Sequence, residues 1–112
     1  METSKRDWKL YREKLPGWQE SYMEKLVEEY IEYLKGDEKA STKFWELEKR
    51  IKRDKKNPGV LIEVSKQDLS FDLVRLILEG VITIHDLDDF SDELKDEVKS
   101  LENMFRKKRG IS

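Results

Sequence analysis

The sequence predicts an all-α protein: one domain, residues 1–112, folded as a compact bundle of five or six helices. Glycine and proline are scarce, with 5 and 2 in 112 residues, and they stand at the breaks between segments. Between these breaks, apolar residues recur at the spacing of one helix face. Several segments also begin with a residue that can cap a helix. Residues 1–4 and 106–112 are expected to be frayed tails.

The first 35 residues predict two helices that are separated at Pro16-Gly17. The first helix spans roughly 4–14. The second, about 16–35, is apolar over about half of its circumference. Its aromatic side holds Trp18, Tyr22, Leu26, Tyr30 and Tyr33, and its aliphatic side holds Met23, Val27, Ile31 and Leu34. We therefore expect this helix to be central, with neighbours on two sides.

A third helix is expected from Ser41, a suitable N-cap, to about Lys55. Its narrow apolar stripe consists of Phe44, Leu47 and Ile51. Trp45 lies off this stripe, so we expect it to be partly exposed or to pack in an interface. Residues 57–64 form a connector, in which residues 60–64 are either extended or helical.

The C-terminal half carries two patterns of the capping-box type, Ser65–Asp68 and Thr83–Asp86. The first predicts a strongly apolar helix, the most buried of the set, that ends at Gly80. Only four of its residues are expected to face water: Ser70, Asp72, Arg75 and Glu79. The second predicts a helix of one or two turns that ends near Phe90. The last helix is expected to begin at Ser91 and to bury Leu94, Val98, Leu101 and Phe105.

Composition excludes several classes of function. There is no cysteine, which rules out disulfides, thiolate zinc sites and a cysteine nucleophile. No apolar run approaches the ~20 residues of a membrane helix, and the N-terminus lacks the apolar region of a secretory signal, so a cytoplasmic protein without a membrane partner is expected. Charged residues make up 43% of the chain, yet the net charge is only −2, which predicts a mixed-sign surface.

The sequence predicts no catalytic residue, cofactor or metal. His85, beside Asp86, is the only histidine, and an imidazole zinc site needs more than one. Asp86 and Glu97 have the spacing of the first and last ligands of a calcium loop. However, the positions that need a ligand and a glycine hold Phe90 and Ser91. Phosphate loops, dinucleotide fingerprints and nucleophile elbows are absent, so we do not expect an enzyme.

Charge is segregated into two segments of opposite sign. Residues 49–56 hold six basic side chains and one acid, whereas residues 86–97 hold seven acids and one lysine. The basic face next to an aromatic is typical of nucleic-acid binding, or else of a solvated face with pairs four residues apart. The candidate residues are Trp45, Lys49, Arg50, Lys52, Arg53 and Lys56. The acidic segment either mimics nucleic-acid phosphates toward a basic protein groove or only favours solubility and helix starts.

Three segments carry a resemblance to a known family: residues 14–23, with Lys14-Leu-Pro-Gly-Trp-Gln-Glu20 and Tyr22-Met23, residues 43–51 and residues 86–94. Together they resemble small proteins, of about this length, that Gram-positive bacteria carry on integrative conjugative elements and related mobile DNA. Some relatives carry the label "multidrug transporter", which this polar sequence contradicts. The resemblance implies no catalytic motif. It implies a role in regulating transfer or in blocking host defences.

These observations predict a non-enzymatic binding protein of a mobile element, of bacterial or phage origin. The first hypothesis is an accessory or inhibitory protein that binds a protein partner, such as an anti-CRISPR-type inhibitor of a nucleic-acid-handling enzyme. The alternatives are a small DNA- or RNA-binding regulator and a homo-oligomeric structural protein. The residues expected to contact a protein partner are Asp86, Asp88, Asp89, Asp92, Glu93, Asp96, Glu97 and Trp45.

Overall fold

Helices are the only regular secondary structure in residues 3–108, the part of the chain that the computed structural model describes. In order they are α1 (Lys5–Leu34), α2 (Ala40–Asp54), α3 (Leu69–Leu78), the short 3-10 helix η1 (Ile84–Leu87) and α4 (Asp92–Lys108). The all-α prediction is confirmed. The predicted number of five or six helices is wrong, since the described chain forms four α-helices.

The miscount comes from Pro16, which lies inside α1 instead of separating two helices. A proline removes one backbone hydrogen bond and crowds the carbonyl group four residues earlier, here that of Arg12. Packing on both sides of Pro16 offsets this cost. Tyr11 and Leu15 are buried in the core, and the Tyr11 ring lies 6.1 Å from Trp8 and 6.5 Å from Trp18. The residues before and after Pro16 therefore form one continuous helix.

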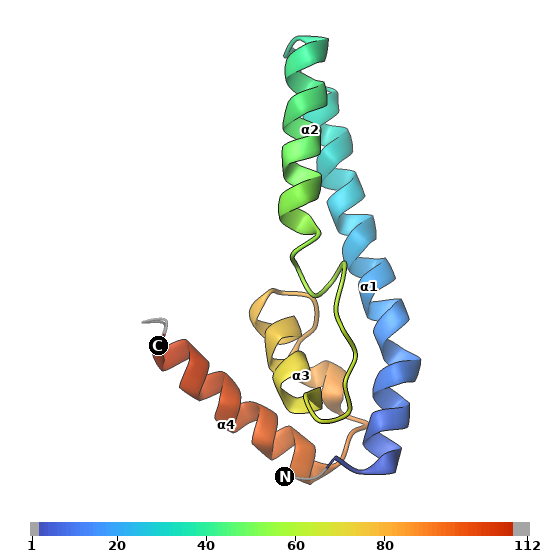
Figure 1. The fold of residues 1–112 in the computed structure, drawn as a ribbon, viewed down its shortest axis with the longest axis vertical. Helices are drawn as coiled ribbons and strands as arrows, with labels where there is room; N and C mark the ends of the chain where they lie inside the picture. Colours follow the sequence, from blue (N-terminus) through green and yellow to red (C-terminus); the bar gives the residue numbers. More distant parts are fainter. Residues whose placement is uncertain (1–2, 109–112) are drawn as a thin grey trace.

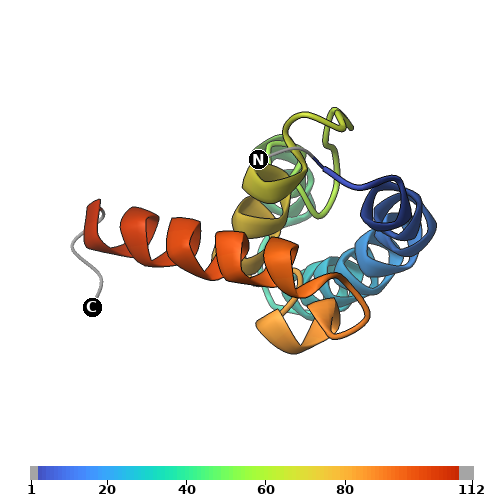
Figure 2. The same ribbon diagram turned by 90° about the horizontal axis from the view of Figure 1, so that it is seen from below.

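The core lies where the N-terminal half of α1 meets α3, η1 and the start of α4 (Figures 1 and 2). Its largest fully buried side chains are Tyr11, Leu69, Leu73, Leu76, Leu87 and Leu94. Phe90, which lies between η1 and α4, is also buried. A polar contact closes the core, because the buried Asp7 carboxylate accepts hydrogen bonds from the backbone N–H and the hydroxyl of Ser91. It ties the starts of α1 and α4 together.

The C-terminal half of α1 leaves this core and pairs with α2 in a long antiparallel hairpin (Figure 1). We call residues 20–34 together with α2 the arm. It accounts for the elongated molecule, which measures 52 × 33 × 21 Å. The expectation that residues 16–35 are central is wrong. Tyr30 and Tyr33 on the aromatic side of this segment contact α2, but Val27 and Ile31 on the aliphatic side remain 50% and 45% exposed.

Local capping signals were reliable only at some helix starts. The capping box of Thr83 forms, with the Asp86 carboxylate accepting from the Thr83 backbone N–H at 2.7 Å. Ser91 accepts from the backbone N–H of Leu94 at 3.2 Å, and Gly80 takes the expected positive φ of 76°. The other two caps are wrong. α2 begins after Lys39 and α3 after Asp68, and neither receives a side-chain cap.

α3 is the most buried helix, as predicted, but it is turned relative to the expected face. Ser70 and Asp72, which were expected to face water, are buried, whereas Phe71 is 48% exposed. The cause is α4, which covers the Ser70 side: Glu97 accepts a hydrogen bond from the Ser70 hydroxyl at 2.8 Å. Phe71 instead lies at the edge of this contact, against Phe105 at 6.2 Å.

The connector from α2 to α3 contains no strand, and residues 61–65 are irregular. It begins with a turn in which Asn57 Oδ1 accepts from the backbone N–H of Gly59 at 2.7 Å. A Cβ atom on Gly59 would come within 2.5 Å of the Tyr22 ring, so only glycine fits here. Of the expected tails, Ser4 caps α1 and residues 106–108 lie in α4. Residues 1–2 and 109–112 lie outside the described residues.

Candidate functional site

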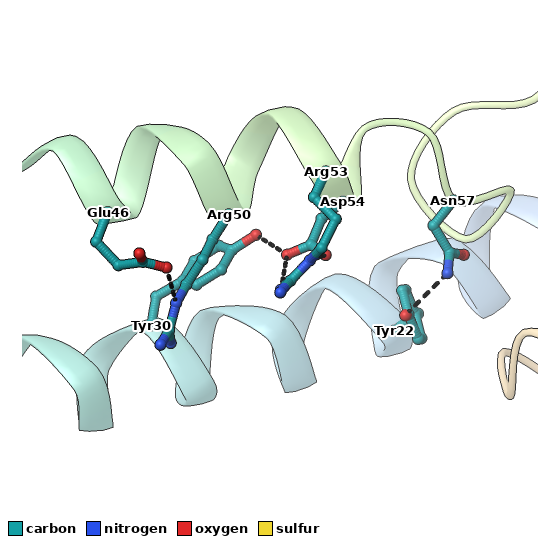
Figure 3. A network of polar contacts seen from close by, with 7 residues as sticks. All are labelled: Tyr22, Tyr30, Glu46, Arg50, Arg53, Asp54 and Asn57. Carbon is teal, nitrogen blue, oxygen red and sulfur yellow. Dashed lines mark hydrogen bonds and ion pairs between the residues drawn. The ribbon is translucent and has the colours of Figure 1, made fainter.

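A row of polar contacts joins the two helices of the arm along one side (Figure 3). The hydroxyl of Tyr30 donates to the carboxylate of Asp54, and Arg53 Nε donates to the same group at 3.0 Å. Nearer the core, Asn57 Nδ2 donates to the Tyr22 hydroxyl at 3.1 Å. We call this row the polar seam; it comprises Tyr22, Tyr30, Arg53, Asp54 and Asn57. It fixes the register of α2 on α1 by directional bonds.

Electrostatics in the seam are consistent with stable pairing. Burial, together with the hydrogen bond to Asp54, raises the pKa of Tyr30 to about 12. Burial alone would raise the pKa of Asp54, but the donors Arg53 and Tyr30 outweigh it and hold that pKa below its usual value. The seam therefore keeps one charge state over the physiological pH range.

One flank of the arm, beside the contact of Tyr30 with Asp54, is apolar and has no neighbour within the described chain. Met23, Val27, Ile31 and Leu34 lie on one stripe of α1, and Phe44 and Ile51 lie on the flank of α2 that is turned the same way. We call these six residues the apolar face. Near the core, Met23, Val27 and Ile51 line a shallow groove that the connector closes with Val60. The expected inward stripe of α2 is thus wrong for Phe44 and Ile51, which are 64% and 39% exposed.

At the far end of the arm two large aromatics lie together on the surface. Trp45 is 62% exposed, in agreement with its predicted position off the core stripe. The ring of Phe44 packs against it edge-on, with centroids 5.0 Å apart. We call Phe44 and Trp45 the tip pair. Edge-on aromatic packing holds both rings in place while they remain accessible.

The basic residues predicted from the sequence do not all share one surface. Lys49, Lys52 and Lys56 are exposed around the outer side of α2, next to Trp45. Arg50 is turned inward instead: its guanidinium lies 4.1 Å from the centroid of the Tyr33 ring and pairs with Glu46 at 2.9 Å. Arg53 is exposed but is paired with Asp54 in the seam. Four of the six candidates, Trp45 and the three lysines, therefore share one outward surface of α2.

Four of the seven predicted acidic residues are engaged in the fold. Asp86 caps η1, Asp89 pairs with Lys14 at 3.3 Å, Asp92 pairs with Lys95 at 3.2 Å, and Glu97 accepts from Ser70. The other three are exposed, and their carboxylates make no ion pair or hydrogen bond with another described residue: Asp88, Glu93 and Asp96.

The apolar face and the seam were both missed as features by sequence reasoning. The signal for the seam was present, because Asp54 is the single acid within the basic run of residues 49–56. A lone acid of that kind pairs with its neighbours or with a facing helix. No local signal marks Asp7, whose partner Ser91 lies 84 positions away along the chain.

Comparison with known proteins gives no further guide: the chain matches no family model, no curated protein and no solved structure. Within residues 3–108, no helix is both long and apolar enough to cross a bilayer. In the same range, no three histidine or carboxylate side chains gather in a way that could hold a metal ion. The candidate functional features of the described chain are therefore surfaces, and the tip pair and the apolar face are the most unusual of them.

Proposed function

We propose that the protein acts by binding another protein, and that the tip of the arm makes the central contact. The observation that carries this proposal is the exposure of the tip pair. Tryptophan is enriched among the residues that dominate binding energy, and such residues are most effective when they are fixed before binding. The Phe44 ring packs edge-on against the Trp45 ring, with centroids 5.0 Å apart, and this contact restricts the indole.

The polar seam supports this use of the arm. Two helices that meet only through apolar side chains can slide, whereas the bonds of Tyr30 to Asp54 and of Asn57 to Tyr22 set one register. The tip pair is thereby held at a constant position relative to the core. A partner then pays little ordering cost when it closes over Trp45.

The partner class is also part of the proposal. The resemblance to proteins of mobile elements favours an accessory or inhibitory role, with a nucleic-acid-handling enzyme as the target. The exposed carboxylates of Asp88, Glu93 and Asp96 support a basic partner, because opposite charges accelerate encounter. These three residues lie in and before α4, at the core, so they act as a second contact beside the arm.

A second candidate function is the binding of nucleic acid by the outer side of α2. It is favoured by the exposed lysines Lys49, Lys52 and Lys56 around Trp45. Lysines neutralise phosphates, and an exposed indole stacks on an unpaired base. The acidic net charge of −2 opposes this alternative.

The proposal is tested with Trp45→Ala and a matched control, Phe71→Ala, which removes a 48% exposed aromatic far from the arm. Partners captured from the native host are identified by mass spectrometry and their affinity is measured by calorimetry. Trp45→Ala is expected to weaken binding by about 2 kcal/mol or more, roughly 30-fold, and to leave the melting temperature unchanged. Phe71→Ala is expected to bind normally.

Equal affinity of wild type and Trp45→Ala would refute the proposal. The second candidate is tested in parallel by fluorescence anisotropy with labelled single and double strands at several salt concentrations. Binding near physiological salt that is lost in Lys49→Glu/Lys52→Glu/Lys56→Glu would replace the first function with the second.

A further inference from the structure

The arm exposes its apolar face, whereas Tyr30, Arg53 and Asp54 of the polar seam are paired with one another. Five residues of this face keep 37–64% of their surface exposed: Val27, Ile31, Leu34, Phe44 and Ile51. Together they present roughly 300–400 Å² of apolar surface, the size of a patch that commonly marks an interaction site. A standard interface buries about 800 Å² per partner, somewhat more than half of it apolar, so this face supplies most of the apolar area of such an interface.

Charges at the edge of the apolar face are arranged in opposite order on the two helices. Along α1, Glu28 is followed two turns later by Lys35. Along α2, Glu48 is followed two turns later by Lys55. The midpoints of these pairs lie beside Ile31 and Ile51. Those two residues are at the same height, because the contacts of Tyr30 with Asp54 and of Arg50 with Tyr33 bracket them.

This pattern is self-complementary. A twofold axis across the arm, through the level of Ile31 and Ile51, places Glu28 of one copy opposite Lys35 of the other. The same axis places Glu48 opposite Lys55. The existing partners of Lys35 and Glu48 are exposed neighbours on their own helices at 3.7 Å, and such surface pairs are weak enough to rearrange.

Shape is complementary under the same axis. Phe44 projects two turns from Ile51 toward the tip of the arm, and it is 64% exposed. On the other side of Ile51, toward the core, lies the groove between Met23, Val27 and Val60, whose lining is almost entirely apolar. The axis exchanges these two positions, so that each Phe44 faces the groove of the other copy.

From the area, the charge order and the shape, we infer that the apolar face binds a second copy of this chain. The two arms lie antiparallel and face to face, and they form a four-helix bundle with a core at each outer end. In such an isologous contact every favourable interaction occurs twice. Trp45 lies on the outer side of α2, away from the centre of the apolar face, so dimerisation leaves its ring accessible while it buries the neighbouring Phe44. The inference does not rest on the function proposed above, because the area, the charge order and the shape do not involve Trp45.

The test is analytical ultracentrifugation of the full chain over a range of concentrations. Wild type is expected to sediment as a dimer at micromolar concentrations. Val27→Glu is expected to raise the dimer dissociation constant roughly 100-fold or more, since the dimer would bury two unpaired carboxylates. The matched control is Lys25→Glu, an exposed charge change on the opposite side of α1, which is expected to leave the dimer intact. Circular dichroism monitors the fold of each variant.

A second measurement tests the geometry. The chain has no cysteine, so Ile31→Cys introduces one thiol per copy beside the proposed axis. Mild oxidation is expected to link Ile31→Cys chains into covalent dimers, whereas Ser21→Cys, on the far side of α1, stays unlinked. A monomer at all concentrations, a dimer unaffected by Val27→Glu, or equal linking of both cysteine variants would each overturn the inference. The Trp45→Ala result has no bearing on these outcomes.

Discussion

Replacing Asp72 by asparagine is expected to stabilise the protein at neutral pH and to have little effect in acid. Asp72 lies in α3 and is only 6% exposed. Burial, reinforced by the negative charge of Asp68, raises the pKa of its carboxyl group to about 6. The hydroxyl of Tyr11 lies beside it. Yet within residues 3–108 neither Tyr11 Oη nor Asp72 Oδ2 has a hydrogen-bond partner of normal geometry.

The sign of this stability change follows from the direction of the pKa shift of Asp72. A carboxyl group with a raised pKa binds its proton more tightly in the folded state than in the unfolded state, where the pKa is near 3.8. The folded state is therefore not penalised below about pH 4, and stability is lost as the pH rises from there through 6. Each unit of pKa difference between the folded and unfolded states corresponds to 1.36 kcal/mol, so the free energy of unfolding at pH 7.5 is lower by about 3 kcal/mol at most.

Asparagine removes the charge and can exchange a hydrogen bond with Tyr11. The expected gain is about 1–3 kcal/mol at pH 7.5, against a change near zero at pH 3.5. Urea denaturation followed by circular dichroism at both pH values measures it. Asp96→Asn, an exposed residue of α4, serves as the control and is expected to change stability by less than about 0.5 kcal/mol. A destabilised Asp72→Asn at pH 7.5, or the same gain at both pH values, would contradict the reasoning.

Two further predictions concern the core. Leu76→Ala is expected to cost about 2–5 kcal/mol in urea denaturation, because Leu76 is fully buried, and Leu101→Ala clearly less, because Leu101 is only partly buried. Equal losses would mean that the outer half of α4 packs more closely than described. Asp7→Ala is expected to lower stability by about 2 kcal/mol or more, because two donors of Ser91 lose their acceptor, whereas Asp88→Ala should be nearly neutral. A neutral Asp7→Ala would show that the contact between α1 and α4 is dispensable.

The elements that sequence reasoning predicted correctly are those set by neighbouring residues. The reciprocal contact of Thr83 with Asp86, the cap of Ser91 and the turn at Gly80 all depend on residues within a few positions. The helix boundary at Pro16 was wrong because the energy that keeps α1 continuous comes from aromatic packing. The residues next to a proline do not indicate whether such contacts form.

The candidate site was less predictable for a related reason. Periodicity shows that Val27 and Ile31 share a stripe, but it does not show whether a neighbour covers that stripe. An apolar stripe was therefore assigned to the interior by default, and the structure leaves it on the surface. Trp45 was placed correctly because its position departs from the stripe of its own helix. The role of Asp54 was not predicted, because its main partner Tyr30 lies 24 residues earlier in the chain and in another helix.

The contact between Asp7 and Ser91 can form only when both residues have been synthesised, so the fold is completed late in synthesis. The two helices of the arm are adjacent in the chain, so they can pair within microseconds of emerging together. The N-terminal half of α1 must wait, because its partners in α3, η1 and α4 are made last. During that interval Trp8 and Tyr11 are exposed along with the face of Val27 and Ile31. Trp8 and Tyr11 stay uncovered until α4, whose Leu94 and Val98 complete the core, has also been made, and exposed apolar surface of this kind promotes aggregation.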